Sequence, residues 1–275
     1  MKKILFSVIL AAAALVSCTS QKKAEPEAET SKVLVLYYSQ TGTTQAVAEA
    51  IQQQLGADIE AIEVENPYSG TYQETIARCQ QEMSAGEAPA VKPLQSNLDN
   101  YETIFLGYPV WFGTYAMPIA GLVKNEAFEG KKIVTFCTFG SGGLNASTEN
   151  LKAALPKAEI VAGYGVRTAR AAAIPAEVNR FLIEGGYAEG EIEALPAFME
   201  HKPVTDADVE VFNEACGDYQ FPLGTPVTCA IRETAESTDY EFAVKANGSE
   251  EVNTTIYVTK AKAEGAKAEF TQVVR

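Results

Sequence analysis

Hydroxyl-bearing side chains gather in one short stretch near the start of the chain, at Ser39, Thr41, Thr43 and Thr44. The stretch follows a run of strand-forming residues, 33–38, contains Gly42, and leads into a helical pattern. Backbone N–H groups point outward at a helix N-terminus, and the helix dipole favours an anion there. Because residues 39–44 lack the lysine of a P-loop, they suit a single terminal phosphate monoester. The alternative is an ordinary N-capping turn. We call residues 39–44 the hydroxyl loop.

Aromatic side chains gather after a second strand-forming run, residues 103–107, at Tyr108, Trp111, Phe112 and Tyr115. Pro109 and Gly113 interrupt regular structure, so we expect a loop there, and we call residues 107–113 the aromatic loop. A flat ring ligand needs aromatic walls and backbone amides at its edge, and this loop can supply both. The alternative for such a cluster is packing in the core.

Glycines gather after a third run, residues 132–137. Residues 138–143 read Thr-Phe-Gly-Ser-Gly-Gly, and we call them the glycine loop. Glycines allow the backbone to approach a planar ligand closely. The dinucleotide pattern of three glycines is not met, because Asn145 stands where its third glycine would be.

Apolar strand patterns alternate with helical patterns from residue 33 onwards. We expect strands over 33–38, 58–64, 103–107, 132–137 and 159–163. We expect helices over 43–54, 71–84, 117–124, 144–154 and 176–184. Near-continuous apolar strands separated by helices predict a doubly wound α/β fold, in which helices cover both faces of a parallel sheet.

The three loops together resemble the FMN site of the flavodoxin-like family, from the Ser39-x-Thr41-Gly42-x-Thr44 motif to Gly-Tyr-Pro-x-Trp-x-Gly over 107–113 and Thr-x-Gly-x-Gly over 138–142. The resemblance covers residues 31–187 and implies a five-stranded parallel sheet in the order 2-1-3-4-5. It also implies FMN as the cofactor. The ligand would bind where the strand order reverses, between the first and third strands.

The resemblance implies a phosphate held by the hydroxyl loop and a flavin ring beside Trp111, with Phe139 or Tyr108 covering its edge. The implied cofactor-binding residues are Ser39, Gln40, Thr41, Gly42, Thr43, Thr44, Gly107, Tyr108, Pro109, Val110, Trp111, Phe112, Gly113, Thr138, Phe139, Gly140, Ser141, Gly142 and Gly143. No catalytic residue and no metal ligand is expected. Arg167 and Arg170, after the fifth strand, are interpreted as surface charges.

The N-terminus has the features of an export signal. Lys2 and Lys3 precede an apolar run that is too short to span a membrane, and the run ends at Ser17 and Cys18. This ending resembles a bacterial lipobox, which implies a signal peptide over 1–17 and lipidation of Cys18. The polar residues 18–30 then read as a flexible tether. We therefore expect an exported, lipid-anchored protein, periplasmic or on the outer surface; the alternative is a plain signal peptide with an incidental cysteine.

Charge and cysteine content restrict the other functions. The net charge of −14 argues against nucleic acid and against adhesion to anionic lipid. A single histidine, His201, excludes a histidine-rich metal site. Cys79 and Cys137 are expected to be buried thiols, whereas Cys216 and Cys229 either pair or stay free.

The last quarter of the chain reads as a separate unit. Residues 188–204 resemble a linker, and residues 205–275 read as one helix followed by antiparallel strands. This order resembles the cystatin-like fold. The hairpin over 232–237 lacks the Gln-x-Val-x-Gly motif of cystatin inhibitors, so an accessory or partner-binding unit with a modest interface to the first domain is expected.

Three functions remain open at this point. The first is a membrane-tethered FMN electron carrier that is served by a redox partner protein or a membrane electron donor. The second is an FMN-dependent quinone or NAD(P)H oxidoreductase. The third is a flavin-free binding lipoprotein with a flavodoxin fold.

Overall fold

The computed structural model describes residues 33–246, 248–249 and 251–275. Contacts divide the chain into residues 1–30 and residues 31–275, and only the second unit is described here. The predicted signal peptide, tether and Cys18 lie outside the described residues.

The first sheet contains five parallel strands in the order β2-β1-β3-β5-β6. They are β1 (Val33–Tyr37), β2 (Asp58–Ala61), β3 (Thr103–Trp111), β5 (Lys132–Phe139) and β6 (Glu159–Arg167). The short β4 (Thr114–Tyr115) pairs with the end of β3. The doubly wound α/β fold and the predicted strand order are therefore confirmed.

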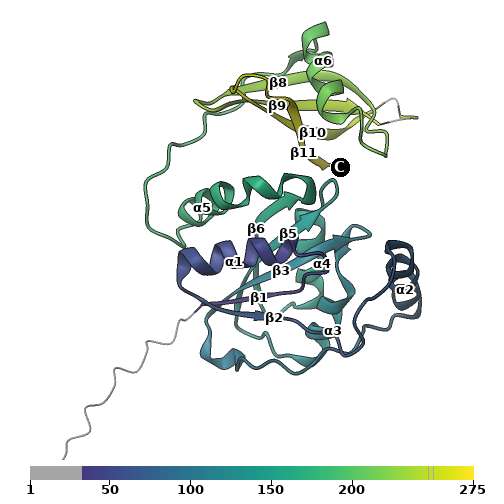
Figure 1. The fold of residues 1–275 in the computed structure, drawn as a ribbon, viewed down its shortest axis with the longest axis vertical. Helices are drawn as coiled ribbons and strands as arrows, with labels where there is room; N and C mark the ends of the chain where they lie inside the picture. The colour runs from purple at the N-terminus through teal and green to yellow at the C-terminus, as the bar shows by residue number, and fades with distance from the viewer. Residues whose placement is uncertain (1–32, 247, 250) are drawn as a thin grey trace, which may run out of the picture. The chain divides into compact units, whose positions relative to one another are not determined.

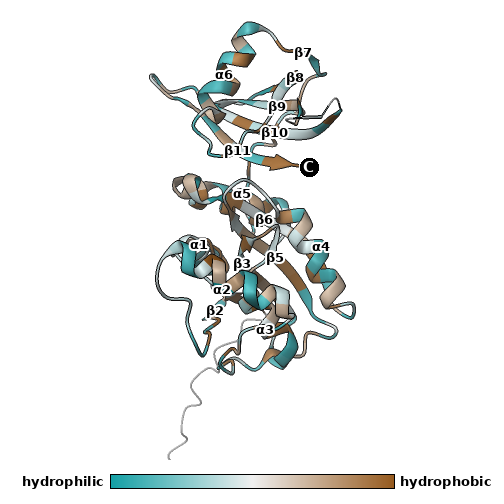
Figure 2. Ribbon diagram, turned by 90° about the vertical axis from the view of Figure 1, so that its right-hand side faces the viewer, coloured by the Kyte–Doolittle hydropathy of each residue, from teal (hydrophilic) through white to brown (hydrophobic). Residues whose placement is uncertain are grey.

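Helices cover both faces of this sheet (Figure 1). They are α1 (Thr43–Leu55), α2 (Tyr72–Ala85), α3 (Met117–Asn125), α4 (Leu144–Ala154) and α5 (Ile174–Glu184). Short 3₁₀ turns occupy Leu98–Asn100 and Thr168–Ala173. Apolar residues of α1 and α5 pack on one face, whereas those of α3 and α4 pack on the other. The strands between them are mostly apolar, as continuous runs in a two-sided core require (Figure 2).

The strand β3 is longer than predicted. It continues from residue 107 to Trp111, and a tight turn at Phe112 and Gly113 leads into β4. Both turn residues have positive φ, 51° and 79°, as a two-residue type I′ hairpin requires. The prediction of a loop beginning at Tyr108 was therefore wrong, because Pro109 interrupts a strand only where its missing N–H is needed for pairing.

A second, antiparallel sheet follows, in the order β11-β10-β9-β8-β7, and we call it the C-terminal sheet. Its strands are β7 (Lys202–Pro203), β8 (Thr225–Glu233), β9 (Ser237–Lys245), β10 (Val252–Ala261) and β11 (Ala268–Val274). One helix, α6 (Asp206–Cys216), packs on it and begins with a capping box between Thr205 and Asp208. The predicted helix-plus-antiparallel-sheet arrangement is confirmed. The predicted linker, 188–204, contains β7 near its end, and this strand pairs with β8.

The C-terminal sheet has its own apolar core. Phe242 is fully buried, and its ring lies 5.2 Å from that of Phe212 on α6. Cys216 and Cys229 belong to the same core as free thiols. The predicted burial of Cys79 and Cys137 is confirmed, and both of these are also free.

We predict that Phe242→Ala lowers the free energy of unfolding by about 3–5 kcal/mol, because it leaves a large cavity in this core. Phe221, which is 58% exposed, provides the matched control. Phe221→Ala should change stability by no more than about 0.5 kcal/mol. Urea denaturation followed by circular dichroism measures both, and equal effects of the two substitutions would contradict the burial that we describe.

Candidate functional site

The hydroxyl loop connects the end of β1 to the start of α1. Gly42 is the N-cap residue of α1, with φ 91°, and no side chain caps this helix. The Gly42 N–H donates to Ser39 Oγ at 3.1 Å, which closes the loop on itself. The first-turn N–H groups of α1 are therefore left for a ligand, and the helix dipole gives their surroundings a positive partial charge.

Thr44 connects the hydroxyl loop to the glycine loop. Its side chain is buried, and its hydroxyl lies 2.8 Å from Thr138 Oγ1 at the end of β5. A buried hydroxyl needs a partner, so each threonine satisfies the other. This pair fixes the distance between the two loops, and neither hydroxyl points into solvent.

The aromatic loop divides into core residues and site residues. Tyr108 is fully buried, packs edge-on against Tyr115 at 6.2 Å, and donates from its hydroxyl to Ser147 Oγ at 3.3 Å. Burial raises the pKa of Tyr108 to about 12, so its phenol stays neutral at pH 7. Phe139 in the glycine loop is also buried in the core. The structure therefore does not bring either ring to the surface, where the resemblance implied that one covers a flavin edge.

Gly107 is required by packing rather than by a ligand. A Cβ atom at this position would lie 2.1 Å from the Phe136 ring. The Gly107 carbonyl accepts a hydrogen bond from the Tyr38 N–H at 2.9 Å, so it is already used within the sheet. Val110 of the aromatic loop packs on the core and against Gly143.

Trp111 forms an aromatic group with two tyrosines beside the hydroxyl loop. The Trp111 ring lies 5.1 Å from Tyr68 and 5.9 Å from Tyr38, edge-on in both cases. Gln40 of the hydroxyl loop donates to the Tyr68 carbonyl at 3.0 Å. The Arg78 guanidinium lies 4.0 Å above the Tyr68 ring. Together these contacts hold aromatic surface next to the uncapped end of α1.

Tyr68 was missed by the sequence analysis. It lies between β2 and α2, in a segment with Pro67 and Gly70. An aromatic residue after the end of a strand is the signal that the sequence analysis used only for the aromatic loop. Phe112, in contrast, is 50% exposed at the tip of the β3–β4 hairpin.

The glycine loop is held through its carbonyl groups. The Gly140 carbonyl accepts from Arg167 Nε at 2.7 Å, and the Ser141 carbonyl accepts from the Val273 N–H of β11 at 2.7 Å. Arg167, at the end of β6, was interpreted as a surface charge, but it is half-buried and contacts the site. It was missed because its partners lie far away in the sequence.

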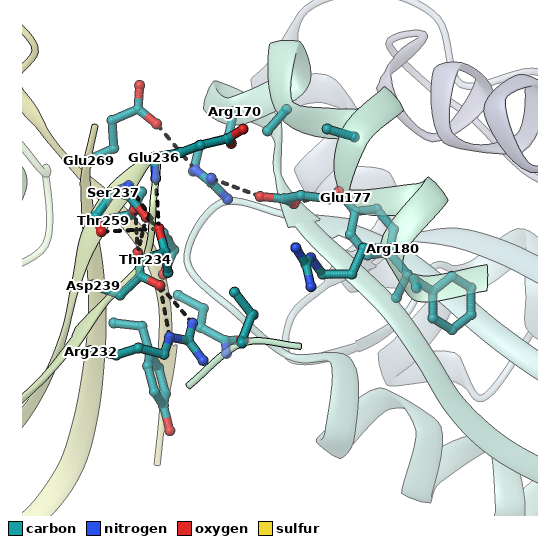
Figure 3. A pocket seen from close by; sticks show the side chains of 18 of the residues that line it. Arg170, Glu177, Arg180, Arg232, Thr234, Glu236, Ser237, Asp239, Thr259 and Glu269 are labelled. Atoms are coloured by element: carbon teal, nitrogen blue, oxygen red, sulfur yellow. Dashed lines mark hydrogen bonds and ion pairs between the residues drawn. The ribbon is translucent and has the colours of Figure 1, made fainter. Parts of the chain in front are cut away.

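A wide cleft of about 1,870 Å³ lies elsewhere, between α5, residues 192–198 and the C-terminal sheet (Figure 3). Some of its charged side chains pair with one another, such as Arg170 with Glu177 at 2.8 Å and Arg232 with Asp239 at 2.7 Å. None of the three loops lines this cleft. Each of the three arginines that line the cleft has a carboxylate partner, so these arginines are not free to bind an anion.

The described residues hold no cluster of three or more histidine, cysteine or acidic side chains placed to bind a metal ion. Within the same residues, no helix has both the length and the apolar character needed to cross a membrane.

The three loops meet at the carboxyl ends of β1, β3 and β5, which are neighbours in the sheet. The chain order reverses between β1 and β3, and ligands of open α/β sheets bind at that point. Uncapped helix N–H groups beside aromatic surface are suited to a ligand with one anionic group and one flat ring.

Comparison with known proteins agrees with this reading of the fold. A family model described as flavodoxin matches residues 32–174. No curated protein matches the chain. A solved structure described as a flavoprotein from Bacteroides eggerthii is 28% identical, with a TM-score of 0.46, over 54% of this chain and 96% of its own. A similar protein from Bacteroides uniformis is 24% identical, with a TM-score of 0.48, over 54% and 97%.

A flavoprotein from Lactobacillus acidophilus, solved in complex with FMN, is 22% identical over 55% of this chain and 98% of its own, with a TM-score of 0.46. The family match spans more than half of the 275 residues. The chain therefore belongs to the flavodoxin family.

Proposed function

We propose that this chain binds one FMN at the three loops and serves as an electron-transfer protein. The observation that carries the proposal is the uncapped N-terminus of α1 beside the aromatic group of Trp111, Tyr68 and Tyr38. The helix N-terminus fits a phosphate monoester, and the aromatic group fits the edge of a flat ring. When bound, FMN would supply the electron chemistry, since its ring accepts and releases electrons reversibly.

The protein would contribute binding, orientation and electrostatics. Hydroxyl groups of Ser39, Thr41 and Thr43 and the first-turn N–H groups of α1 would hold the phosphate without a cationic side chain. Trp111 would lie against the ring. Tyr108 and Phe139 would support the site from the core, because both are buried.

The thiols of the described residues are not suited to carrying the electrons. Burial raises the pKa of the Cys79 thiol to about 11 and that of the Cys229 thiol to about 12, so both stay protonated. Cys137 is fully buried, and burial raises the pKa of its thiol as well. Protonated, inaccessible thiols react slowly, which leaves the flavin as the electron carrier.

We further propose that the protein is exported and anchored through a lipid on Cys18, so that a membrane electron donor or a redox partner protein serves it. The short apolar run that ends at Cys18 supports this proposal, as does the polar tether, residues 18–30. The net charge of −14 would keep the folded part away from anionic lipid, which makes the anchor the main attachment.

We predict that the chain without residues 1–30 binds FMN in a one-to-one complex. Titration of the apoprotein should quench flavin fluorescence to a single end point, because the loops form one site. No quenching at micromolar FMN would refute both redox functions and favour a flavin-free binding protein.

We predict that Thr41→Ala weakens FMN binding by about 1.5–3 kcal/mol, the value of a hydrogen bond to a charged group. Thr41 is exposed in the hydroxyl loop, whereas Thr44 is tied to Thr138, so Thr41 is the cleaner position. Riboflavin lacks the phosphate and serves as the control. Its affinity should stay unchanged, and equal losses for both flavins would place the phosphate elsewhere.

We predict that Cys18→Ser moves the protein from the membrane fraction to the soluble fraction and leaves its thermal midpoint unchanged, because the lipid acceptor is lost and the fold is not. Cys79→Ser, within the folded part, is the control and should stay with the membrane. Membrane association of the Cys18 variant would mean that the anchor lies at another position.

A further inference from the structure

The C-terminal sheet contacts the glycine loop, although the sequence indicated an accessory unit. We propose that the C-terminal sheet is a working part of the flavin site: Arg167 and the free edge of β11 hold the carbonyl groups of the glycine loop, so that its N–H groups face the flavin. This inference rests on the proposed function, because it assigns a role toward the same cofactor. Arg167 is accordingly a positioning residue.

Arg167 joins the two sheets through two carbonyl groups. Its Nε donates to the Gly140 carbonyl, and its Nη1 donates to the Phe270 carbonyl of β11, both at 2.7 Å. Its guanidinium also lies 4.2 Å above the Phe270 ring. The planar fork of arginine allows these bonds to form at the same time, and a lysine ammonium cannot reproduce them. Arg167 thus fixes one peptide of the loop relative to β11.

The free edge of β11 supplies the second contact. One edge of β11 pairs with β10, and its other edge turns to the loop, where the Val273 N–H donates to the Ser141 carbonyl at 2.7 Å. A Cβ atom on Gly142 would lie 2.3 Å from the Val273 carbonyl oxygen. Only a glycine therefore allows the strand to approach this closely. The contact also covers an edge strand that would otherwise expose unpaired backbone groups.

An ion pair reinforces the same contact. Arg170 is largely buried, and it binds Glu177 of α5 at 2.8 Å and Glu269 of β11 at 3.3 Å (Figure 3). The position of β11 against the first domain is thus set by three separate interactions, through Arg167, Val273 and Arg170.

These contacts determine the direction in which the N–H groups of the glycine loop point. The described residues contain no cis peptide, and in a trans peptide the N–H points opposite to the preceding carbonyl. The Gly140 carbonyl is bound by Arg167 of β6 and the Ser141 carbonyl by Val273 of β11, so the N–H groups of Ser141 and Gly142 point away from these two partners. Within the described part of the chain, neither N–H has a hydrogen-bond acceptor. Two unpaired donors therefore remain for the polar rim of a flavin.

Donors aimed at the ring affect the reduced flavin most. Reduction adds electron density to the ring, and preorganised N–H groups stabilise it. Loosening the loop should therefore weaken binding of reduced FMN more than binding of oxidised FMN, which lowers the midpoint potential. If the C-terminal sheet only packed against the first domain, the same loosening would lower the stability of the protein and leave the midpoint potential of FMN unchanged.

The test compares Arg167→Lys with the unaltered protein, both without residues 1–30. Lysine keeps the positive charge near the loop and loses the fork, so the substitution separates positioning from charge. We expect reduced FMN to bind about tenfold more weakly relative to oxidised FMN, which equals a fall of about 30 mV in the two-electron midpoint potential. Amide exchange at Val273, whose N–H donates to the Ser141 carbonyl, should also become faster in the apoprotein.

Two further variants complete the test. Arg180→Lys is the matched control, since Arg180 binds Glu184 and the Glu193 carbonyl away from the loops, and its potential should equal that of the unaltered protein. Val273→Pro removes the donor to Ser141 at a position on the free edge, where proline is tolerated, although it also replaces a buried side chain of the C-terminal sheet. It should lower the potential in the same direction as Arg167→Lys.

The outcomes separate the inference from the proposed function. A lower potential in the Arg167 and Val273 variants, with the Arg180 variant unchanged, would support the inference. An unchanged potential in either folded loop variant would overturn it while leaving FMN binding in place. Failure of the unaltered protein to bind FMN would instead refute the proposed function and the inference built on it, whatever the amide exchange shows.

Discussion

The pairing of β1 with β3 is the constraint on which the candidate site depends. Their parallel register places Tyr37 opposite Gly107, and the Tyr38 N–H continues the ladder to the Gly107 carbonyl. Because both strands end at the same edge, the hydroxyl loop and the aromatic loop are brought together. The Phe136 ring fills the space beside Gly107, so a larger residue there would separate β3 from β5. The geometry of the site thus follows from sheet packing.

Local patterns explain why much of this fold could be predicted. Apolar runs and 3.6-residue periodicity are properties of neighbouring residues, and they gave α4 its predicted bounds, 144–154. The strand order, in contrast, was implied by the resemblance of the three loops to the flavodoxin-like family. The helix predicted over 43–54 likewise began at the observed residue, directly after Gly42, which is the N-cap residue of α1.

Contacts between distant residues explain what could not be predicted. Tyr108 and Trp111 look alike in the sequence, yet Tyr108 reaches Ser147 on α4 while Trp111 meets Tyr68 after β2. Whether an aromatic residue of this loop lies in the core or at the site depends on which distant residue it contacts. Arg167 is the same case, since its partner Phe270 lies 103 residues away. The role of Arg167 depends on the contact of β11 with the glycine loop, and no short stretch of the sequence contains both segments.

The charge distribution gives this docking a physical consequence. The chain carries a net charge of −14, and negative charge around a flavin opposes the addition of electrons. Arg167 introduces a cation at the glycine loop, where burial lowers the pKa of its guanidinium without removing the charge, because arginine is effectively always protonated. The exposed acidic residues are screened by salt, so those far from the loop contribute little there. Arg167 binds the Gly140 carbonyl, so its charge lies at the loop itself. Positive charge at this position would oppose the effect of the net negative charge on the addition of electrons to a bound flavin.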